Sequence, residues 1–357
     1  MTSLLHRLGM SIPLIQAPMA GTSTPNLAAA VASAGGLGSI ALGAGNAEAG
    51  RQLIASTRAL TDKPFNVNVF CHESAQRDAV READWLLALA PAFARFGAAP
   101  PTVIHEIYRS FRADPDMVEM LVAERPAVVS FHFGLPSDEV IGRLKSAGAV
   151  LFATATSLAE GRLVEAAGID AVVAQGYEAG GHRGMFDPEA PDDRLSTLAL
   201  VQLLARELSI PVIAAGGIMN GGGIAAALAS GALAAQLGTA FIGCPESAAD
   251  AGHRAALSSE AALHTVMTDA ISGRPARCLA NGFTAFAADL DAPRAAYPVA
   301  YDAGKALNAA AKAAGDSSFG AQWAGQGAPL ARALPAAELC DLLMREYASV
   351  RAALAVR

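Results

Sequence analysis

The 357-residue chain is 53% hydrophobic and only 17% charged, which suits a large buried core and excludes a disordered chain. Its formal net charge of -7, with no Lys/Arg-rich stripe, argues against a nucleic-acid partner. No uninterrupted apolar run reaches about 18 residues and no charged segment leads into one, so we expect a cytoplasmic protein without signal peptide or membrane span.

Short β-branched runs alternate with longer Ala/Leu-rich stretches over the first two thirds of the chain, a pattern of repeated βα units. Because the runs are almost continuously apolar, they predict strands buried on both faces of a parallel sheet. Eight such units predict an α/β fold, a closed TIM (β/α)8 barrel over residues 1–241. The expected strands are Pro13–Met19, Leu37–Leu42, Pro64–Phe70, Ala127–Gly134, Val150–Thr156, Ala171–Gly176, Pro211–Gly217 and Leu233–Thr239.

Two regions depart from this alternation. The interval from Ala75 to Arg125 is too long for one crossover and predicts two or three helices. After the eighth strand, residues 242–326 carry helical patterns at Ser247–Thr265 and Val299–Ala314 between Gly- and Pro-rich loops. We expect this helical and loop extension to cover the barrel mouth as a lid. Residues 327–357 are expected to form a C-terminal helix, starting at Ala336, that packs on the barrel.

Cysteine usage indicates neither a metal centre nor a redox motif. Cys71, Cys244, Cys278 and Cys340 lie far apart and none belongs to a CxxC pair. We expect free, mostly buried thiols, as is usual in a reducing compartment.

Glycine-rich turns follow the last two expected strands, where TIM barrels hold phosphate groups. Gly216 and Gly217 remove side chains so that backbone N–H groups can approach a ligand, and Gly238 and Thr239 add further donors. A helix starting near Asn220 would direct its positive end to the same point. Either pair alone would be explained by a tight turn. Two pairs in register at consecutive strand ends predict a phosphate cradle, such as that for FMN.

The segment AQGYEAGGHRG leaves the sixth expected strand and carries the second group of candidates. Gln175 offers a donor and an acceptor suited to the pyrimidine edge of a flavin. Gly180 and Gly181 predict a flexible or positive-φ loop that brings His182 over the barrel mouth, where it would accept a proton near neutral pH. A surface or structural histidine is the alternative.

Three other strand ends carry candidate residues. In QAPM, Pro18 would stiffen the turn and leave the backbone of Met19 and Ala20 facing a flat ring. Asn66 and Asn68 alternate on the third strand and therefore point to one face, where a polar cofactor could satisfy their amides. His132 ends the fourth strand and is equally compatible with a supporting and a purely structural role.

In the extension, Tyr297, Tyr301 and Lys305 are spaced to share one helix face. Spacing alone is also explained by an ordinary amphipathic surface. The segment QWAGQGA, residues 322–328, combines an aromatic ring, two glycines and an amide, which is more typical of a loop that meets a ligand than of a helix.

In order and spacing, these motifs resemble the nitronate monooxygenases, formerly called 2-nitropropane dioxygenases, and their class I members in particular. The resemblance covers nearly the whole chain through QAPMAGTSTP, NVNVF, GYEAGGHRG, PVIAAGGIMNGGGIAAAL, GALAAQLGTAF and WAGQGA. One departure is that Met219-Asn220 stands where an Asp often follows the GGI turn.

The resemblance implies an FMN enzyme that oxidises alkyl nitronates, such as propionate 3-nitronate, with O₂ to carbonyl compounds and nitrite, as in nitroalkane detoxification. The flavin is expected to take a single electron from the bound nitronate, and no NAD(P)H is needed. Nitronate or nitroalkane and O₂ are the expected partners of a monomer or homodimer.

The resemblance also implies roles for particular residues. The catalytic residue would be His182. The substrate-binding residues would be His132, Tyr297, Tyr301 and Lys305. The cofactor-binding residues would be Ala17, Pro18, Met19, Asn68, Gln175, Gly180, Gly181, Gly216, Gly217, Met219, Gly238, Thr239, Trp323, Gly325 and Gln326.

Three alternatives stay open from the sequence. An FMN-dependent enoyl-ACP reductase or an NADH:quinone reductase would use the same barrel with a nicotinamide as electron donor. A non-catalytic flavin-binding protein would share the phosphate cradle without the chemistry.

Overall fold

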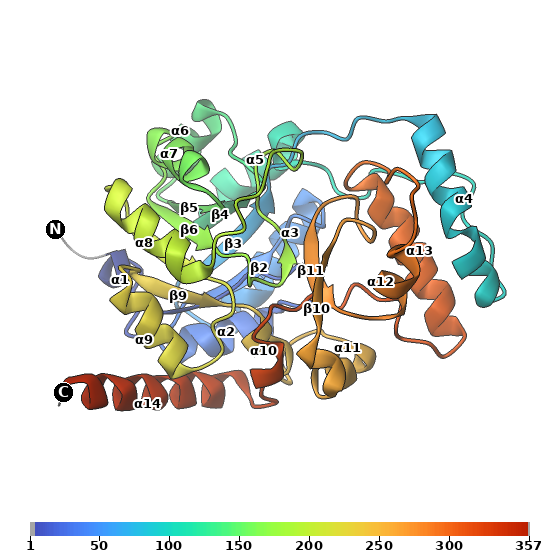
Figure 1. The fold of residues 1–357 in the computed structure, drawn as a ribbon. Coiled ribbons are helices and arrows are strands. Elements are labelled where there is room, and N and C mark those ends of the chain that lie inside the picture. Colours follow the sequence, from blue (N-terminus) through green and yellow to red (C-terminus); the bar gives the residue numbers. More distant parts are fainter. Residues whose placement is uncertain (1–3, 356–357) are drawn as a thin grey trace.

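The computed structural model describes residues 4–355, so the first three residues of the expected barrel segment and the last two of the expected C-terminal segment lie outside it. A parallel sheet of eight strands forms its centre (Figure 1). The strands run in the order β1-β9-β8-β6-β5-β4-β3-β2, and a parallel bridge from Ile15 to Leu37 joins the two ends. The strands are β1 (Leu14–Gln16), β2 (Gly38–Ala41), β3 (Phe65–Phe70), β4 (Val128–His132), β5 (Val150–Ala155), β6 (Ala171–Gln175), β8 (Val212–Ala215) and β9 (Ala234–Leu237). The predicted TIM barrel is therefore confirmed, and each expected strand is present.

Helices surround the sheet because polar capping residues follow the strands and begin the next helix. Thr24, Asn46, Ser137, Ser157 and Ser196 each accept a backbone N–H of the first helical turn through the side-chain oxygen. The barrel helices are α2 (Pro25–Ser33), α3 (Ala47–Arg58), α5 (Pro115–Glu124), α6 (Asp138–Ser146), α7 (Leu158–Ala166), α8 (Thr197–Glu207), α9 (Gly221–Ala229) and α10 (Thr239–Ile242).

The two ends of the barrel differ in how they are closed. At the amino ends of the strands, Leu8 and Met10 follow α1 (Leu4–Arg7) and pack with inward-facing residues such as Val150, Phe152 and Ile213. This packing fills the barrel interior at the amino ends of the strands. The carboxyl ends of the strands stay available for a site, as is usual in this fold.

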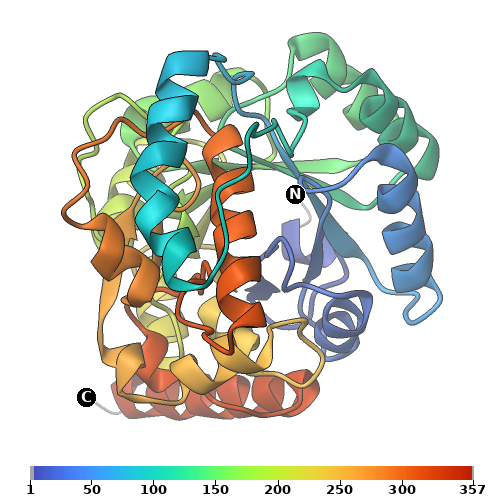
Figure 2. The same ribbon diagram turned by 90° about the vertical axis from the view of Figure 1, so that its right-hand side faces the viewer.

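A second hydrophobic core lies beside the barrel, and it is built from two segments far apart in the sequence. Trp85 and Phe93 of α4 (Ala79–Arg95) pack with Phe283, Leu307 and Phe319 from the extension. Helices α4 and α13 lie side by side in Figure 2. The extension comprises α11 (Ala251–Leu257), η2 (Glu260–Leu263), β10 (Thr265–Thr268), β11 (Ala276–Leu279), α12 (Gly282–Ala287) and α13 (Val299–Ala313). The short helix η3 (Ala328–Leu330) follows it, before the last helix. The long interval before β4 contains α4, η1 (Phe111–Ala113) and α5.

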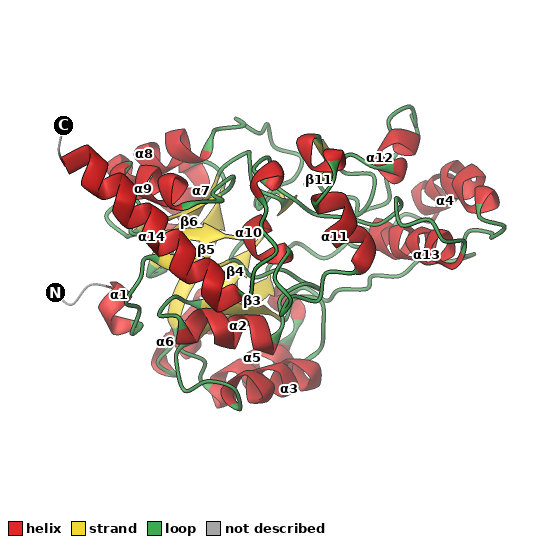
Figure 3. Ribbon diagram, turned by 90° about the horizontal axis from the view of Figure 1, so that it is seen from below, coloured by secondary structure: helices red, strands yellow, loops and turns green. Residues whose placement is uncertain are grey.

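The last helix, α14 (Ala336–Ala355), crosses the outside of the barrel against α9 and α2 (Figure 3). Among the helices of the described chain, none combines the length and hydropathy that a membrane span needs. All four cysteines are buried and free. Within residues 4–355, no group of three or more His, Cys, Asp or Glu side chains is arranged to hold a metal ion.

Candidate active site

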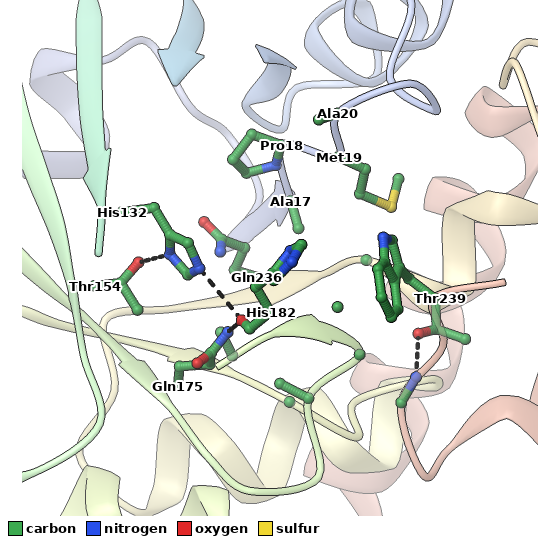
Figure 4. Close-up of a pocket in the computed structure, with 18 of the residues that line it drawn as sticks. Ala17, Pro18, Met19, Ala20, His132, Thr154, Gln175, His182, Gln236 and Thr239 are labelled. Carbon is green, nitrogen blue, oxygen red and sulfur yellow. Dashed lines mark hydrogen bonds between the residues drawn. The ribbon is translucent and has the colours of Figure 1, made fainter. Parts of the chain in front are cut away.

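A cavity lies at the carboxyl ends of the barrel strands, between the barrel and the extension (Figure 4). The barrel contributes residues at the ends of β1, β3, β4, β6, β8 and β9, and the extension contributes Tyr297, Tyr301 and Trp323. Most residues predicted from the sequence line this one cavity: Ala17, Pro18, Met19, Asn68, His132, Gln175, Gly180, Gly181, His182, Gly216, Gly217, Met219, Gly238, Thr239, Tyr297, Tyr301, Trp323 and Gly325. The structure does not place Lys305 or Gln326 on its wall.

Glycines at one end of the cavity let three chain segments approach one another backbone to backbone. A Cβ on Gly180 would lie 2.4 Å from the Gly325 nitrogen, which real structures do not tolerate. Gly216 and Gly217 have φ values of 127° and 68°, in the left-handed region that favours glycine. The Thr239 hydroxyl accepts the Gly325 N–H at 2.9 Å, which joins the end of β9 to the extension. This end of the cavity is therefore a cradle of closely packed glycine backbone.

The amino end of α9 does not face the cavity in the way the sequence led us to expect. Asn220 caps the helix, but the Gly221 N–H donates to the Glu346 carboxylate at 2.8 Å. Arg332 pairs with that carboxylate at 2.7 Å. The Glu346 carboxylate of α14 therefore accepts the first N–H of α9 and lies at its positive end.

The two asparagines of β3 share one face, but only Asn68 reaches the cavity. Asn68 donates through Nδ2 to the Ser130 carbonyl at 3.1 Å and to its hydroxyl at 3.0 Å. Asn66 lies deeper, where Nδ2 donates to Ser39 at 3.2 Å. Side chains two residues apart on a strand point to the same face but lie at different depths in the barrel. Asn66 and Asn68 therefore do not belong to the same site.

Gln175 and His132 both use their side chains to hold the backbone of His182 (Figure 4). Gln175 donates from Nε2 to the His182 carbonyl at 3.0 Å, and its Oε1 accepts the Gly184 N–H at 2.7 Å. His132 Nε2 lies 3.3 Å from the same carbonyl, and its Nδ1 lies 3.0 Å from the Thr154 hydroxyl. A carbonyl only accepts, so His132 carries its proton on Nε2. Both ring nitrogens of His132 are thus engaged within the protein.

His182 lies on a short strand, β7 (Gly181–His182), not on a free loop. Gly181 has a φ of 74°, as the glycine pair predicted, and β7 pairs with β11 so that His182 is opposite Ala276. The His182 ring centroid is 5.1 Å from that of Trp323 and 5.3 Å from that of Tyr297. Its Nε2 lies 2.9 Å from the Ser272 hydroxyl. The imidazole is therefore held from several sides at the cavity wall.

The surroundings of His182 favour an uncharged imidazole. Burial, followed by the nearby His132, Arg274 and His72, lowers the pKa of His182 to about 3. Arg274 is itself buried: its guanidinium lies 4.2 Å from the Phe133 ring centroid and donates to the Met185 carbonyl. Its Nε has no hydrogen-bond partner among the described residues. A buried cation beside the cavity disfavours protonation of the ring and favours an anion nearby.

Tyrosines form the wall toward the extension, and one of them was not predicted. Tyr108 lines the cavity together with Tyr297 and Tyr301, and its ring centroid is 5.8 Å from that of Tyr301. Lys305 is exposed behind them, with Nζ 4.7 Å from the Tyr108 ring centroid and 5.2 Å from that of Tyr301. The hydroxyl of Tyr297 is buried without a partner among residues 4–355, so it is a donor available to a bound molecule.

Phe133, Ser272 and Arg274 were also missed from the sequence. Phe133 has a φ of 73°, unusual for a bulky residue, and such backbone often occurs at functional sites. No local pattern distinguishes Ser272 or Arg274, because their relation to His182 depends on the pairing of β11 with β7.

Comparison with known proteins gives a consistent result. The family model for nitronate monooxygenase matches residues 2–346. A nitronate monooxygenase of Paraburkholderia phytofirmans is 63% identical over 345 residues, covering 96% of this chain and 94% of that protein. A nitronate monooxygenase of Pseudomonas aeruginosa is 57% identical over 340 residues, covering 95% of this chain and 97% of that protein.

Two solved structures are similar over almost their whole length. A nitroalkane oxidase from Streptomyces ansochromogenes superimposes with a TM-score of 0.90 at 42% identity, covering 98% of this chain and 99% of that chain. FabK from Thermotoga maritima superimposes with a TM-score of 0.74 at 30% identity, covering 98% and 97%.

Proposed function

The chain belongs to the nitronate monooxygenase family, which comprises flavin-dependent oxidoreductases, and from this premise we propose that it oxidises alkyl nitronates such as propionate 3-nitronate with O₂. The products are carbonyl compounds and nitrite. The observation that carries the proposal is the uncharged His182 ring at the cavity wall. The buried cation Arg274 acts on this ring and favours an anionic substrate.

We propose FMN as the flavin, because the cavity combines an open mouth with a narrow cradle suited to a single phosphate group. The proposed phosphate loops carry Gly180, Gly216, Gly217 and Gly325 on the cavity wall. An added Cβ on Gly180, Gly216 or Gly325 would clash with the neighbouring chain and displace these loops. When bound, the flavin supplies the redox chemistry by accepting an electron from the nitronate. Heat release of the flavin and its separation by chromatography identify it as FMN, or contradict this assignment if FAD or riboflavin is found.

His182 has two tasks in the proposed reaction. With a neutral nitroalkane, the unprotonated ring accepts the proton from the carbon next to the nitro group. With a nitronate, which has already lost that proton, the ring helps to hold the anion. Charging the ring costs free energy beside Arg274, and the negative charge that forms on the substrate oxygens offsets part of this cost. The same electrostatics favour substrates that arrive already as anions.

A reductase on the same barrel is the weaker candidate. The two relatives of 63% and 57% identity are named nitronate monooxygenases. FabK is less similar in sequence than these relatives, and less similar in structure than the nitroalkane oxidase. Mixing the FMN-loaded protein with excess NADH under anaerobic conditions separates the two functions. We expect the flavin to stay oxidised with NADH and to be reduced by nitronate, and rapid bleaching by NADH alone would favour a reductase.

The partners and location follow from the same premise. O₂ is the proposed co-substrate, and oxygen uptake that depends on nitronate tests it. Four buried free cysteines suit a reducing compartment, which supports a cytoplasmic location. Monomer and homodimer are both compatible with the fold, and light scattering distinguishes them.

A further inference from the structure

Ser272 is a buried serine whose hydroxyl touches the His182 ring. It lies in the turn between β10 and β11 and is fully inaccessible to solvent. Its Oγ is 2.9 Å from His182 Nε2 and 3.1 Å from the backbone carbonyl of Arg274. Ser272 does not border the cavity itself, so it contacts the site only through the histidine.

The hydrogen-bond inventory decides which of these groups is the donor. A hydroxyl has one proton to donate and lone pairs that accept. The Arg274 carbonyl has no other donor among the described residues, so the Ser272 proton satisfies it. The Ser272 oxygen then accepts a hydrogen bond from the Nε2–H of His182. The reverse arrangement would leave the carbonyl of the buried residue Arg274 without a donor, which is unfavourable.

The other ring nitrogen of His182 is left for the substrate. Nδ1 makes no hydrogen bond within residues 4–355, and it is absent from the polar atoms that are buried without a partner. Since the ring borders the cavity, Nδ1 is the nitrogen that a bound molecule can reach.

We propose that Ser272 is a positioning residue that fixes His182 as the Nε2–H tautomer, so that Nδ1 is the proton acceptor. This inference rests on the proposed function. In the step it serves, the bond between the α-carbon and its hydrogen breaks and the proton moves to Nδ1. The electron pair stays on the substrate, which becomes a nitronate, while the ring becomes an imidazolium that still donates from Nε2 to Ser272.

The fold holds the turn of Ser272 in register with His182. Gly273 has a φ of 83°, and a Cβ there would lie 2.4 Å from the Ala295 carbonyl oxygen, so the turn requires glycine. Immediately after it, the Arg183 N–H donates to the Pro275 carbonyl at 2.8 Å, and Ala276 pairs with His182 across the strands. Ser272 and His182 are therefore positioned by the same small sheet.

The most direct test is the nitrogen-15 spectrum of imidazole-labelled, FMN-loaded protein, with the His182→Asn variant used to assign the signal. We expect a protonated Nε2 and an unprotonated Nδ1 at pH 7 in the wild type, and loss of this strong preference in Ser272→Ala. A protonated Nδ1 in the wild type would overturn the inference, because that nitrogen could not accept a proton.

Kinetics supply a second readout that a merely structural role would not move. Ser272→Ala should reduce kcat on neutral nitroethane at least tenfold more than kcat on ethyl nitronate, because only the neutral form must lose a proton. Ser272→Thr keeps the hydroxyl and should restore much of the ratio. Ser209→Ala, which removes an exposed hydroxyl bonded to Glu165, is the matched control and should leave both rates unchanged. Equal losses on both substrates would contradict the inference.

Failure of this inference and failure of the proposed function are distinguishable. If the wild-type protein releases nitrite but its His182 ring carries the proton on Nδ1, the proposed function is supported and the proposed role of Ser272 is wrong. If no nitrite is released from any nitronate, the proposed function itself is wrong.

Discussion

His72 provides a quantitative test of the electrostatics around the site. Its side chain is only 1% exposed, with its ring centroid 5.0 Å from that of Tyr297. Burial, and then the positive charge of Arg274, lowers the pKa of His72 to about 4. In the unfolded chain the pKa is about 6.5, so the unfolded state binds more protons between these two values. The contribution of the neutral His72 to the free energy of unfolding is therefore fully present above pH 6.5 and is lost as the pH falls toward 4.

The size of the effect follows from the two pKa values. At pH 5, about 97% of His72 side chains are protonated in the unfolded state and about 10% in the folded state, which corresponds to about 2 kcal/mol lost relative to pH 7.5. His72→Phe removes the titrating group and keeps an aromatic ring. Urea unfolding of FMN-saturated wild type and variant at both pH values isolates the contribution, because all other titrating groups are common to the two proteins.

We expect the free energy of unfolding of the wild type to fall by about 2 kcal/mol more than that of His72→Phe between pH 7.5 and 5. The stability of the variant at either pH alone does not matter for this comparison. Parallel losses within a few tenths of a kcal/mol would refute the reasoning, since they would mean that His72 titrates in the folded protein as it does in water.

Three further predictions concern the site. His182→Asn should lower kcat on nitroethane by about 100-fold, in the range expected for loss of a general base, and an unaffected rate would remove His182 from that role. Gly180→Ala should lower bound flavin several-fold in absorbance spectra, because the added Cβ would lie 2.4 Å from the Gly325 nitrogen; Gly142→Ala, with nothing within 4 Å, is the control and should retain its flavin. Lys305→Ala should raise KM for propionate 3-nitronate more than KM for nitroethane, because a cation near the tyrosine wall attracts anions; equal changes would exclude it.

The barrel strands and the turns that follow them could be predicted from the sequence because their signals are local. A buried parallel strand reads as a short apolar run, and Gly216, Gly217 and Gly181 adopt the positive φ values that glycine suggests. Because the strands of the barrel are parallel, their carboxyl ends lie at the same mouth, and most of the candidate residues therefore line one cavity.

The partners of the candidate side chains could not be predicted in the same way. Gln175 was assigned to the cofactor from its residue type and position, and His132 to the substrate from the family resemblance. The structure shows in addition that both side chains contact the His182 carbonyl. Glu346, more than 120 residues away in sequence, occupies the helix end that Asn220 was expected to direct at a phosphate. Such contacts depend on tertiary packing, and a single sequence carries no periodic signal for them.

The second core illustrates the same limit at a larger scale. For the long segment after β3, the sequence predicted that helices were present but not what they would pack against. Its helix α4 packs Trp85 and Phe93 against residues of the extension, such as Phe283 and Phe319, that follow much later in the sequence. Tyr108 lines the cavity and packs with Phe70, Phe133 and Tyr297, contacts between distant segments that were missed for the same reason.

The central claim is tested most directly by following oxygen uptake and nitrite release together during turnover of propionate 3-nitronate by the FMN-loaded protein, without NADH. We predict that both occur and that nitrite accumulates in proportion to the oxygen consumed. Oxygen uptake without nitrite, or no turnover until NADH is added, would contradict the account.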